Sequence, residues 1–268
     1  KEVIEEGKKQ FKILNEKYSM QDKEIPKFHF IYRKRNWNGM EECYMGWERK
    51  RGMLNQFNEY LLGNIENPFK INTLEKIPKI KYVITLDSDT ELVLNSGLEL
   101  IGAMEHVLNR PILNKKQNAV IDGHALIQPR VGINMEAANK NTFTKIFAGV
   151  GGFDSYTNAI SDTYQDNFNE GIFTGKGIYN LEVFSRVLNN EIPENTVLSH
   201  DLLEGSYLRC ALASDIVVMD GYPTSYMSSK QREHRWIRGD FQISKWIKNK
   251  IDNKKEIKKQ NPLNTLSR

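Results

Sequence analysis

Two aspartates lie one residue apart, directly after an apolar run. The run Tyr82–Leu86 has the length and composition of a buried strand, and Asp87, Ser88 and Asp89 follow it. Alternate side chains of an extended segment point the same way, so both carboxylates could face one hard cation such as Mg²⁺. The alternative is a helix N-cap or an Asx turn, because Asp is common at both after a strand.

A third aspartate, Asp201, follows Leu198, Ser199 and His200 where a helix is predicted to begin. Asp201 is a candidate general base if it lies beside a pocket. The alternative is an ordinary helix start, with Ser199 as the N-cap and Asp201 stabilising the first turn. These adjacent residues cannot form a Ser-His-Asp triad, because the three roles need side chains from separate elements. The five histidines of the chain show no spacing typical of a helical zinc site.

Two glycines flank a lysine at Gly175-Lys176-Gly177, which invites comparison with a phosphate-binding loop. The glycine spacing is one residue short of that motif, and Gly177 stands where a Ser or Thr would hold the metal. We therefore expect a flexible turn before a helix at this point.

A basic and aromatic run, Arg232 to Asp240, contains Arg235 and Trp236 side by side. One interpretation is an amphipathic helix whose tryptophan belongs to the core. The other is a sugar–phosphate site, in which guanidinium groups bind phosphate and the indole contacts a sugar face.

The elements that must position these residues alternate between helices and short β-branched runs. Helices are expected at about 2–18, 47–62, 96–108, 139–147, 180–189, 201–213 and 229–248. Strands are expected at 28–32, 82–86, 119–128 and 215–219. This order predicts an α/β fold with a mostly parallel sheet, and in such sheets ligands bind outside the carboxyl ends of the strands.

The composition suits one large domain or two small ones. The 268 residues are 39% hydrophobic and 27% charged, with a formal net charge of +4. Thirty-eight basic residues against 34 acidic ones disfavour a nucleic-acid binder, which needs concentrated positive charge.

Two cysteines make no disulfide framework and favour a reducing compartment. The sequence holds no apolar run long enough for a membrane span, and both ends look like cuts in a longer protein.

The order of the motifs is more specific than any one of them. It resembles the GT-A glycosyltransferases that build β-linked polysaccharides at the membrane, with their K-x-G-x-L-N, D-x-D, T-E-D and Q-x-x-R-W motifs. The matching residues are Lys50, Gly52, Leu54, Asn55, Asp87, Asp89, Asp201, Arg235 and Trp236. Three residues depart from the pattern: Ser199 and His200 replace Thr-Glu, and Arg232 stands where Gln is usual.

These departures narrow the resemblance to one family. The segments WNGMEECYMGWERKRG, YVITLDSDTEL, FTGKGIY, PENTVLSHDLLEG and HRWIRGDFQ are similar to the glucosyltransferase module of cyclic β-1,2-glucan synthases. The resemblance extends from about Phe28 to Trp246. Two alternatives stay open: a GT-A synthase of another β-linked polysaccharide, and a non-catalytic sugar-nucleotide-binding module.

The resemblance implies an inverting transfer of glucose from UDP-glucose to the 2-hydroxyl of a growing β-1,2-glucan. It implies a divalent metal, Mg²⁺ or Mn²⁺, on Asp89, and Asp201 as the catalytic base. The donor residues it implies are Lys50, Asp87, Asp89, Arg235 and Arg238. The acceptor residues it implies are Gly175, Gly177 and Trp236.

The same resemblance sets expectations for the domain and its place in the cell. It implies a GT-A domain over residues 1–247 that is incomplete at its N-terminus, with the uracil-binding strands upstream of residue 1. Residues 248–268 form a Lys-rich tail that would lead towards a membrane region outside this chain. The expected location is the cytoplasmic face of the bacterial inner membrane, as part of a larger protein.

Overall fold

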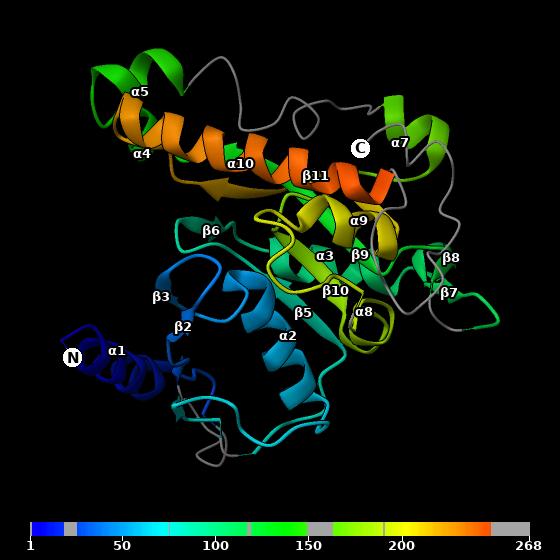
Figure 1. The fold of residues 1–268 in the computed structure, drawn as a ribbon, viewed down its shortest axis with the longest axis horizontal. Coiled ribbons are helices and arrows are strands. Elements are labelled where there is room, and N and C mark those ends of the chain that lie inside the picture. Colours follow the sequence, from blue (N-terminus) through cyan, green and yellow to red (C-terminus); the bar gives the residue numbers. More distant parts are fainter. Residues whose placement is uncertain are drawn as a thin grey trace. The chain divides into compact units, whose positions relative to one another are not determined.

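The computed structural model describes residues 2–18, 26–74, 76–116, 119–148, 163–189 and 191–247. The expected Lys-rich tail, 248–268, lies outside these residues. The chain divides into two compact units, Lys1–Ile80 and Lys81–Arg268. Each unit is described by itself (Figure 1). The expected single domain over residues 1–247 stays a prediction.

In the described residues of the first unit, the chain forms helices and short strands. They are α1 (Glu2–Tyr18), β1 (Ile31–Tyr32), β2 (Asn36–Asn38), β3 (Cys43–Met45), α2 (Arg49–Leu61) and β4 (Ile71–Asn72). Strand β1 pairs with β4 and β2 with β3, both antiparallel. The expected helix at 2–18 is confirmed, whereas only Ile31–Tyr32 of the expected strand 28–32 forms a strand.

The second unit is built on a five-stranded sheet with the order β5-β10-β9-β11-β6. These strands are β5 (Tyr82–Thr85), β6 (Thr90–Leu92), β9 (Leu126–Ile133), β10 (Gly177–Asn180) and β11 (Cys210–Asp220). A separate hairpin pairs β7 (Ile112–Leu113) with β8 (Val120–Asp122). The described helices of the second unit are α3 (Ser96–Glu105), the 3₁₀ helix η1 (Val107–Asn109), α4 (Met135–Asn139), α5 (Thr142–Phe147), α7 (Thr163–Phe168), α8 (Leu181–Leu188), α9 (Asp201–Leu208) and α10 (Tyr226–Ile247).

The expectation of a mostly parallel sheet is wrong. Only β9 and β11 run parallel, while the pairs β5–β10, β10–β9 and β11–β6 are antiparallel. The reason is that β10 lies between β5 and β9 and runs against both, and β6 lies at the opposite edge from β5. A chain that alternates helices and strands gives parallel neighbours only when each helix crosses back over the sheet. The mixed α/β character is confirmed.

Glycines and a left-handed arginine explain three differences in the element boundaries. The expected strand 119–128 is divided between β8 and β9, and Gly123, with φ +64°, lies in the break. The expected helix 201–213 ends at Leu208, because Arg209 takes a left-handed φ of 51°, and β11 begins at Cys210. Gly175 and Gly177 lead into strand β10 first and only then into helix α8.

Among the described residues, apolar clusters on α3 and on α9 stabilise the second unit. Helix α3 packs on the sheet through Leu100 and Met104, which join Ile127, Ile178 and Ile216 of the central strands. The second cluster joins helix α9 to the last part of α10, and its members are Ile192, Val197, Leu203, Ile243 and Trp246. Among the described residues, no helix is both long and apolar enough to cross a membrane.

Candidate active site

A buried lysine joins two of the strand ends. Lys176 Nζ lies 3.1 Å from Asp87 Oδ2 and 2.7 Å from Asp220 Oδ2. Burial opposes the charge of Lys176, but its hydrogen bonds and ion pairs with Asp220 and then Asp87 outweigh that effect and raise the pKa of the ammonium group. Lys176 is therefore a permanent cation between one buried and one partly exposed carboxylate.

The two aspartates after strand β5 have different surroundings. The turn is closed by a hydrogen bond from Thr90 N to Asp87 O, and the Asp87 carboxylate contacts Lys176. Asp89 is exposed, and Gly221 N donates to its main-chain oxygen at 2.9 Å. A Cβ on Gly221 would lie only 3.1 Å from Asp89 Cβ. The interpretation that both carboxylates face one cation stays a prediction, and in this structure Asp87 contacts the lysine whereas Asp89 lines a pocket.

This pocket has a volume of about 840 Å³ and opens to solvent. Its walls come from the turn after β5, the start of β6, the ends of the parallel strands β9 and β11, and the first half of α10. The lining residues are Asp89, Glu91, Asn134, Glu136, Ala137, Lys140, Gly221, Tyr222, Pro223, Ser228, Gln231, Arg232 and Arg235. The pocket is thus lined by carboxylates, Asp89, Glu91 and Glu136, and by cations, Lys140, Arg232 and Arg235.

Arg232 is held between two aromatic rings beside this pocket. Its guanidinium carbon lies 4.8 Å from the ring centre of Trp236 and 5.7 Å from that of Tyr222. Burial lowers the pKa of Arg232, but an arginine stays protonated at neutral pH. Trp236 is 38% exposed and is therefore not a core residue. It lines a second, neighbouring pocket of about 550 Å³ together with Phe143, Phe147, Tyr222 and Tyr226.

Asp201 lies in the first turn of α9, against the loop that carries Lys176. A Cβ on Gly175 would lie 3.0 Å from Asp201 Oδ1, so the backbone of Gly175 passes directly beside the carboxylate. The residue before the helix is His200 rather than Ser199, and it makes no side-chain cap. The expected Ser199 cap is therefore wrong.

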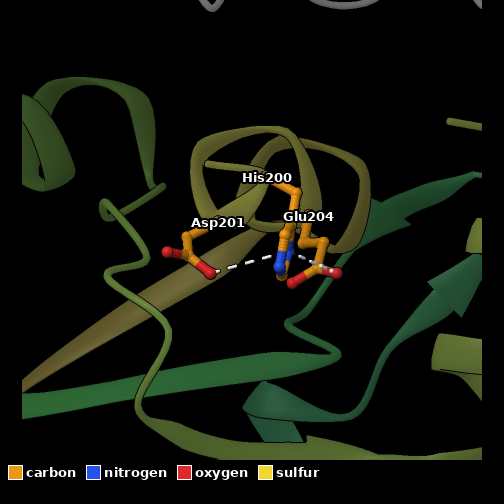
Figure 2. Close-up of side chains that lie close together, drawn as sticks. All are labelled: His200, Asp201 and Glu204. Carbon is orange, nitrogen blue, oxygen red and sulfur yellow. Dashed lines mark ion pairs between the residues drawn. The ribbon is translucent and has the colours of Figure 1, made fainter. Parts of the chain in front are cut away.

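His200 lies between two carboxylates of its own helix (Figure 2). Its Nδ1 is 2.9 Å from Glu204 Oε1 and 3.6 Å from Asp201 Oδ1. Potential ligand atoms of these three residues all lie within 4.8 Å of one another, so they could also hold a metal ion. His200 and Glu204 are buried and Asp201 is partly exposed, so Asp201 is the member of the group that an incoming molecule can reach.

The donor atoms at Asp89 fit a hard divalent cation. The carboxylates of Asp89 and Glu91 and the amide of Asn134 line the same open pocket. Carboxylate and amide oxygens are the ligands that Mg²⁺ and Mn²⁺ prefer, and Mg²⁺ is usually held by one or two carboxylates plus substrate phosphates.

The structure brings together several of the residues singled out in the sequence. Asp89 and Arg235 line one pocket, Trp236 lines the next one, and Gly175 contacts Asp201. Arg238 is exposed on α10 but outside the lining of either pocket, and Gly177 begins strand β10. Lys50 lies on α2 in the first unit, so its role in donor binding stays a prediction.

Sequence reasoning missed Lys176 as the shared partner of Asp87 and Asp220, and Arg232 as part of the pocket. The sequence held a signal for the ion pairs of Lys176. Lys176 directly precedes an apolar strand, and a buried lysine is nearly always paired with an acid. The missing partner could have been sought among acids at strand ends, where Asp220 closes the apolar run of β11. His200 and Glu204 are one helical turn apart, which was a signal for their contact.

Comparison with known proteins identifies the chain as a relative of bacterial polysaccharide synthases. No model of a known protein family matches it. It is 40% identical over 250 residues, 92% of its length, to cyclic beta-(1,2)-glucan synthase NdvB of Rhizobium meliloti (strain 1021). The chain is thus related to one segment of a cyclic glucan synthase, which confirms the family resemblance drawn from the motifs. It spans 9% of the length of that relative.

Proposed function

We propose that the chain is the glucosyltransferase module of a cyclic β-1,2-glucan synthase. In this proposal it transfers glucose from UDP-glucose to the 2-hydroxyl of a growing β-1,2-glucan, with inversion at the anomeric carbon. We further propose that its second unit belongs to a GT-A fold. The module would act at the cytoplasmic face of the bacterial inner membrane, through membrane regions outside this chain.

One observation supports this function most strongly. Asp89 and Arg235 belong to the two motifs that suggested a sugar-nucleotide site, and they line the same pocket although they are far apart in the sequence. A pocket lined by both oxygen ligands and guanidinium groups suits a metal-bound diphosphate. Arg232, which replaces the usual Gln, adds a second guanidinium to the lining of the pocket.

The residues of the chain divide the work of binding between them. Arg235, with Arg232 beside it, would bind the diphosphate of the donor, and Arg238 would add positive charge from the same helix. Asp87 would accept hydrogen bonds from hydroxyls of the donor's ribose or sugar. Asp89 would hold the divalent ion, which when bound offsets charge on the departing diphosphate.

Asp201 would act as the general base. Its carboxylate accepts the proton of the acceptor 2-hydroxyl while that oxygen forms a bond to the anomeric carbon. The bond from the anomeric carbon to UDP breaks in the same step, so an α-linked donor gives a β-linked product. Gly175 and Gly177 leave room for a sugar close to the backbone, and Trp236 offers a sugar face beside the pocket.

The test is transfer by the intact protein. Radiolabelled UDP-glucose, Mg²⁺ or Mn²⁺ and a β-1,2-glucan primer are incubated with the protein, and the product is analysed for linkage and anomeric configuration. We expect β-1,2-linked label that is absent when the ion is chelated. UDP-galactose and GDP-glucose serve as control donors.

The possible results separate the proposal from its alternatives. A β-linked product with another linkage would indicate a different polysaccharide synthase. Binding of UDP-glucose without transfer to any primer would indicate a non-catalytic sugar-nucleotide-binding module. Absence of both binding and transfer would overturn the proposed function.

A further inference from the structure

We propose that Lys176 is a positioning residue for the donor, a built-in counter-ion that holds the Asp87 carboxylate in place to receive the sugar nucleotide. This inference rests on the proposed function. It assigns to Lys176 a role that acts through Asp87, at 3.1 Å, rather than through direct contact with the donor.

The charges around Lys176 do not suit a purely structural ion pair. Asp220 is the natural structural partner, because its side chain is 3% exposed and lies 2.7 Å from the ammonium group. That single contact already compensates the buried lysine. Asp87 adds a second carboxylate that is 37% exposed, so Asp87 is the accessible acid of the three residues, while Arg232 adds positive charge near Asp220.

Lys176 is flanked by two glycines whose positions leave little room for a side chain. Gly177 has a φ of +156°, and a Cβ there would lie 2.3 Å from Ile127 O. Gly175, on the other side, has a φ of +88° and contacts the Asp201 carboxylate. Gly175 and Lys176 are adjacent in the chain. Gly175 lies beside Asp201, the proposed general base, and Lys176 contacts Asp87, the proposed donor-binding acid.

The position of the ammonium group also separates the roles of the two aspartates after β5. Lys176 already supplies a positive charge at Asp87, and repulsion disfavours a divalent ion in the same place. The divalent ion is left to Asp89, on the pocket side. Asp87 is then an anionic hydrogen-bond acceptor for donor hydroxyls, with one of its oxygens anchored by the lysine.

The experiment measures UDP-glucose binding by calorimetry, without acceptor, in the intact protein with and without Mn²⁺. The variants are Lys176→Met, Asp87→Asn, Asp220→Asn and the double changes of Lys176→Met with each aspartate. Thermal unfolding is recorded for each variant. We expect Lys176→Met to weaken donor binding by at least ~10-fold, and by less than ~2-fold in the Asp87→Asn background, because the lysine acts through that residue.

Variants that carry Asp220→Asn separate the effect of Lys176 on stability from its effect on donor binding. Lys176→Met alone leaves a buried Asp220 without its cation and should lower the unfolding temperature. Lys176→Met with Asp220→Asn should recover the unfolding temperature but not donor affinity. If Lys176→Met alone does not fold, this double variant still measures donor affinity without the buried unpaired charge.

Three outcomes would overturn the inference. The first is unchanged donor affinity in folded Lys176→Met protein. The second is an equal loss of donor affinity on Lys176→Met in the unaltered protein and in the Asp87→Asn variant. The third is recovery of donor affinity when Asp220→Asn is added to Lys176→Met. No binding of UDP-glucose by the unaltered protein would instead refute the proposed function, so the two failures are distinguishable.

Discussion

The Asp201 carboxylate lies against the backbone of Gly175, and a methyl group on that glycine would be closer to it than ordinary van der Waals contact. A Cβ at that glycine would be 3.0 Å from Oδ1 and 3.2 Å from Oδ2 of Asp201. A main-chain segment at this distance restricts where the carboxylate can point. Any substitution at Gly175 must move the segment, the carboxylate, or both.

Gly175→Ala is therefore expected to impair transfer far more than donor binding. The added methyl group displaces the Asp201 carboxylate, and the left-handed backbone adds about 1–2 kcal/mol of strain. Gly63→Ala is the matched control, because Gly63 has a φ of +73° but nothing within 4 Å of its Cβ position. Steady-state kinetics should show a lower kcat for Gly175→Ala alone, and an equal effect of both changes would contradict the expectation.

Asp201→Asn should keep UDP-glucose binding and lose transfer. Asn has nearly the same shape but cannot accept the acceptor's proton, and a lost general base costs roughly 10²–10⁴-fold in rate. Calorimetry checks binding, and labelled product checks transfer. Near-normal turnover would remove Asp201 from the mechanism.

Asp89→Asn should weaken UDP binding in the presence of Mn²⁺ and leave the weaker metal-free binding almost unchanged. The substitution removes an anionic ligand from the pocket wall. Asp215→Asn is the control, because Asp215 is exposed on β11 and its loss changes the net charge equally. Identical UDP affinities for Asp89→Asn and the unaltered protein, with and without ion, would show that the aspartate only closes a turn.

Trp236→Ala should impair use of the glucan acceptor with only a small loss of stability. Trp236 is 38% exposed, and its contact with Arg232 is of the kind worth about 0.5–1 kcal/mol at exposed sites. Trp246→Ala is the matched core control, because Trp246 is 6% exposed and its removal should cost ~3–5 kcal/mol. Chemical denaturation gives the free energy of unfolding of both variants. An equal loss of stability in Trp236→Ala and Trp246→Ala would show that Trp236 packs as a core residue.

Cys210 and Cys43 should differ sharply in reactivity towards iodoacetamide. Burial raises the pKa of the Cys210 thiol far above its ordinary value, so the reactive thiolate does not form near pH 8. Cys43 is exposed. Mass spectrometry of peptides from the native protein should find label on Cys43 and almost none on Cys210, and equal labelling in denaturant provides the control.

Local patterns in the sequence predicted the first apolar strand of the sheet and several of the helices. The apolar run at Tyr82–Leu86 became strand β5, and the amphipathic periodicities of α1, α2 and α10 gave helices close to the expected ranges. These features depend on neighbouring residues, whose spacing is visible in the chain. The resemblance also named Asp89 and Arg235, which the structure places around one pocket.

Strand direction and ion-pair partners could not be predicted in the same way. No local pattern shows that β10 lies between β5 and β9, since pairing depends on segments distant in the sequence. The partner of Asp87 is Lys176, which was interpreted only as part of a turn. Trp236 could be either core or surface from periodicity alone, and tertiary packing decided between them.

The parallel pairing of β9 with β11 has a consequence for how the protein folds. Ile133 and Asp220 end these strands side by side, although the chain between them is long. Closing such a loop costs conformational entropy before any contact rewards it, and folds rich in distant pairings form slowly. The pocket walls meet only when this pair has formed, so we expect the ability to bind nucleotide to arise late in refolding, after helix α3 and the β7–β8 hairpin.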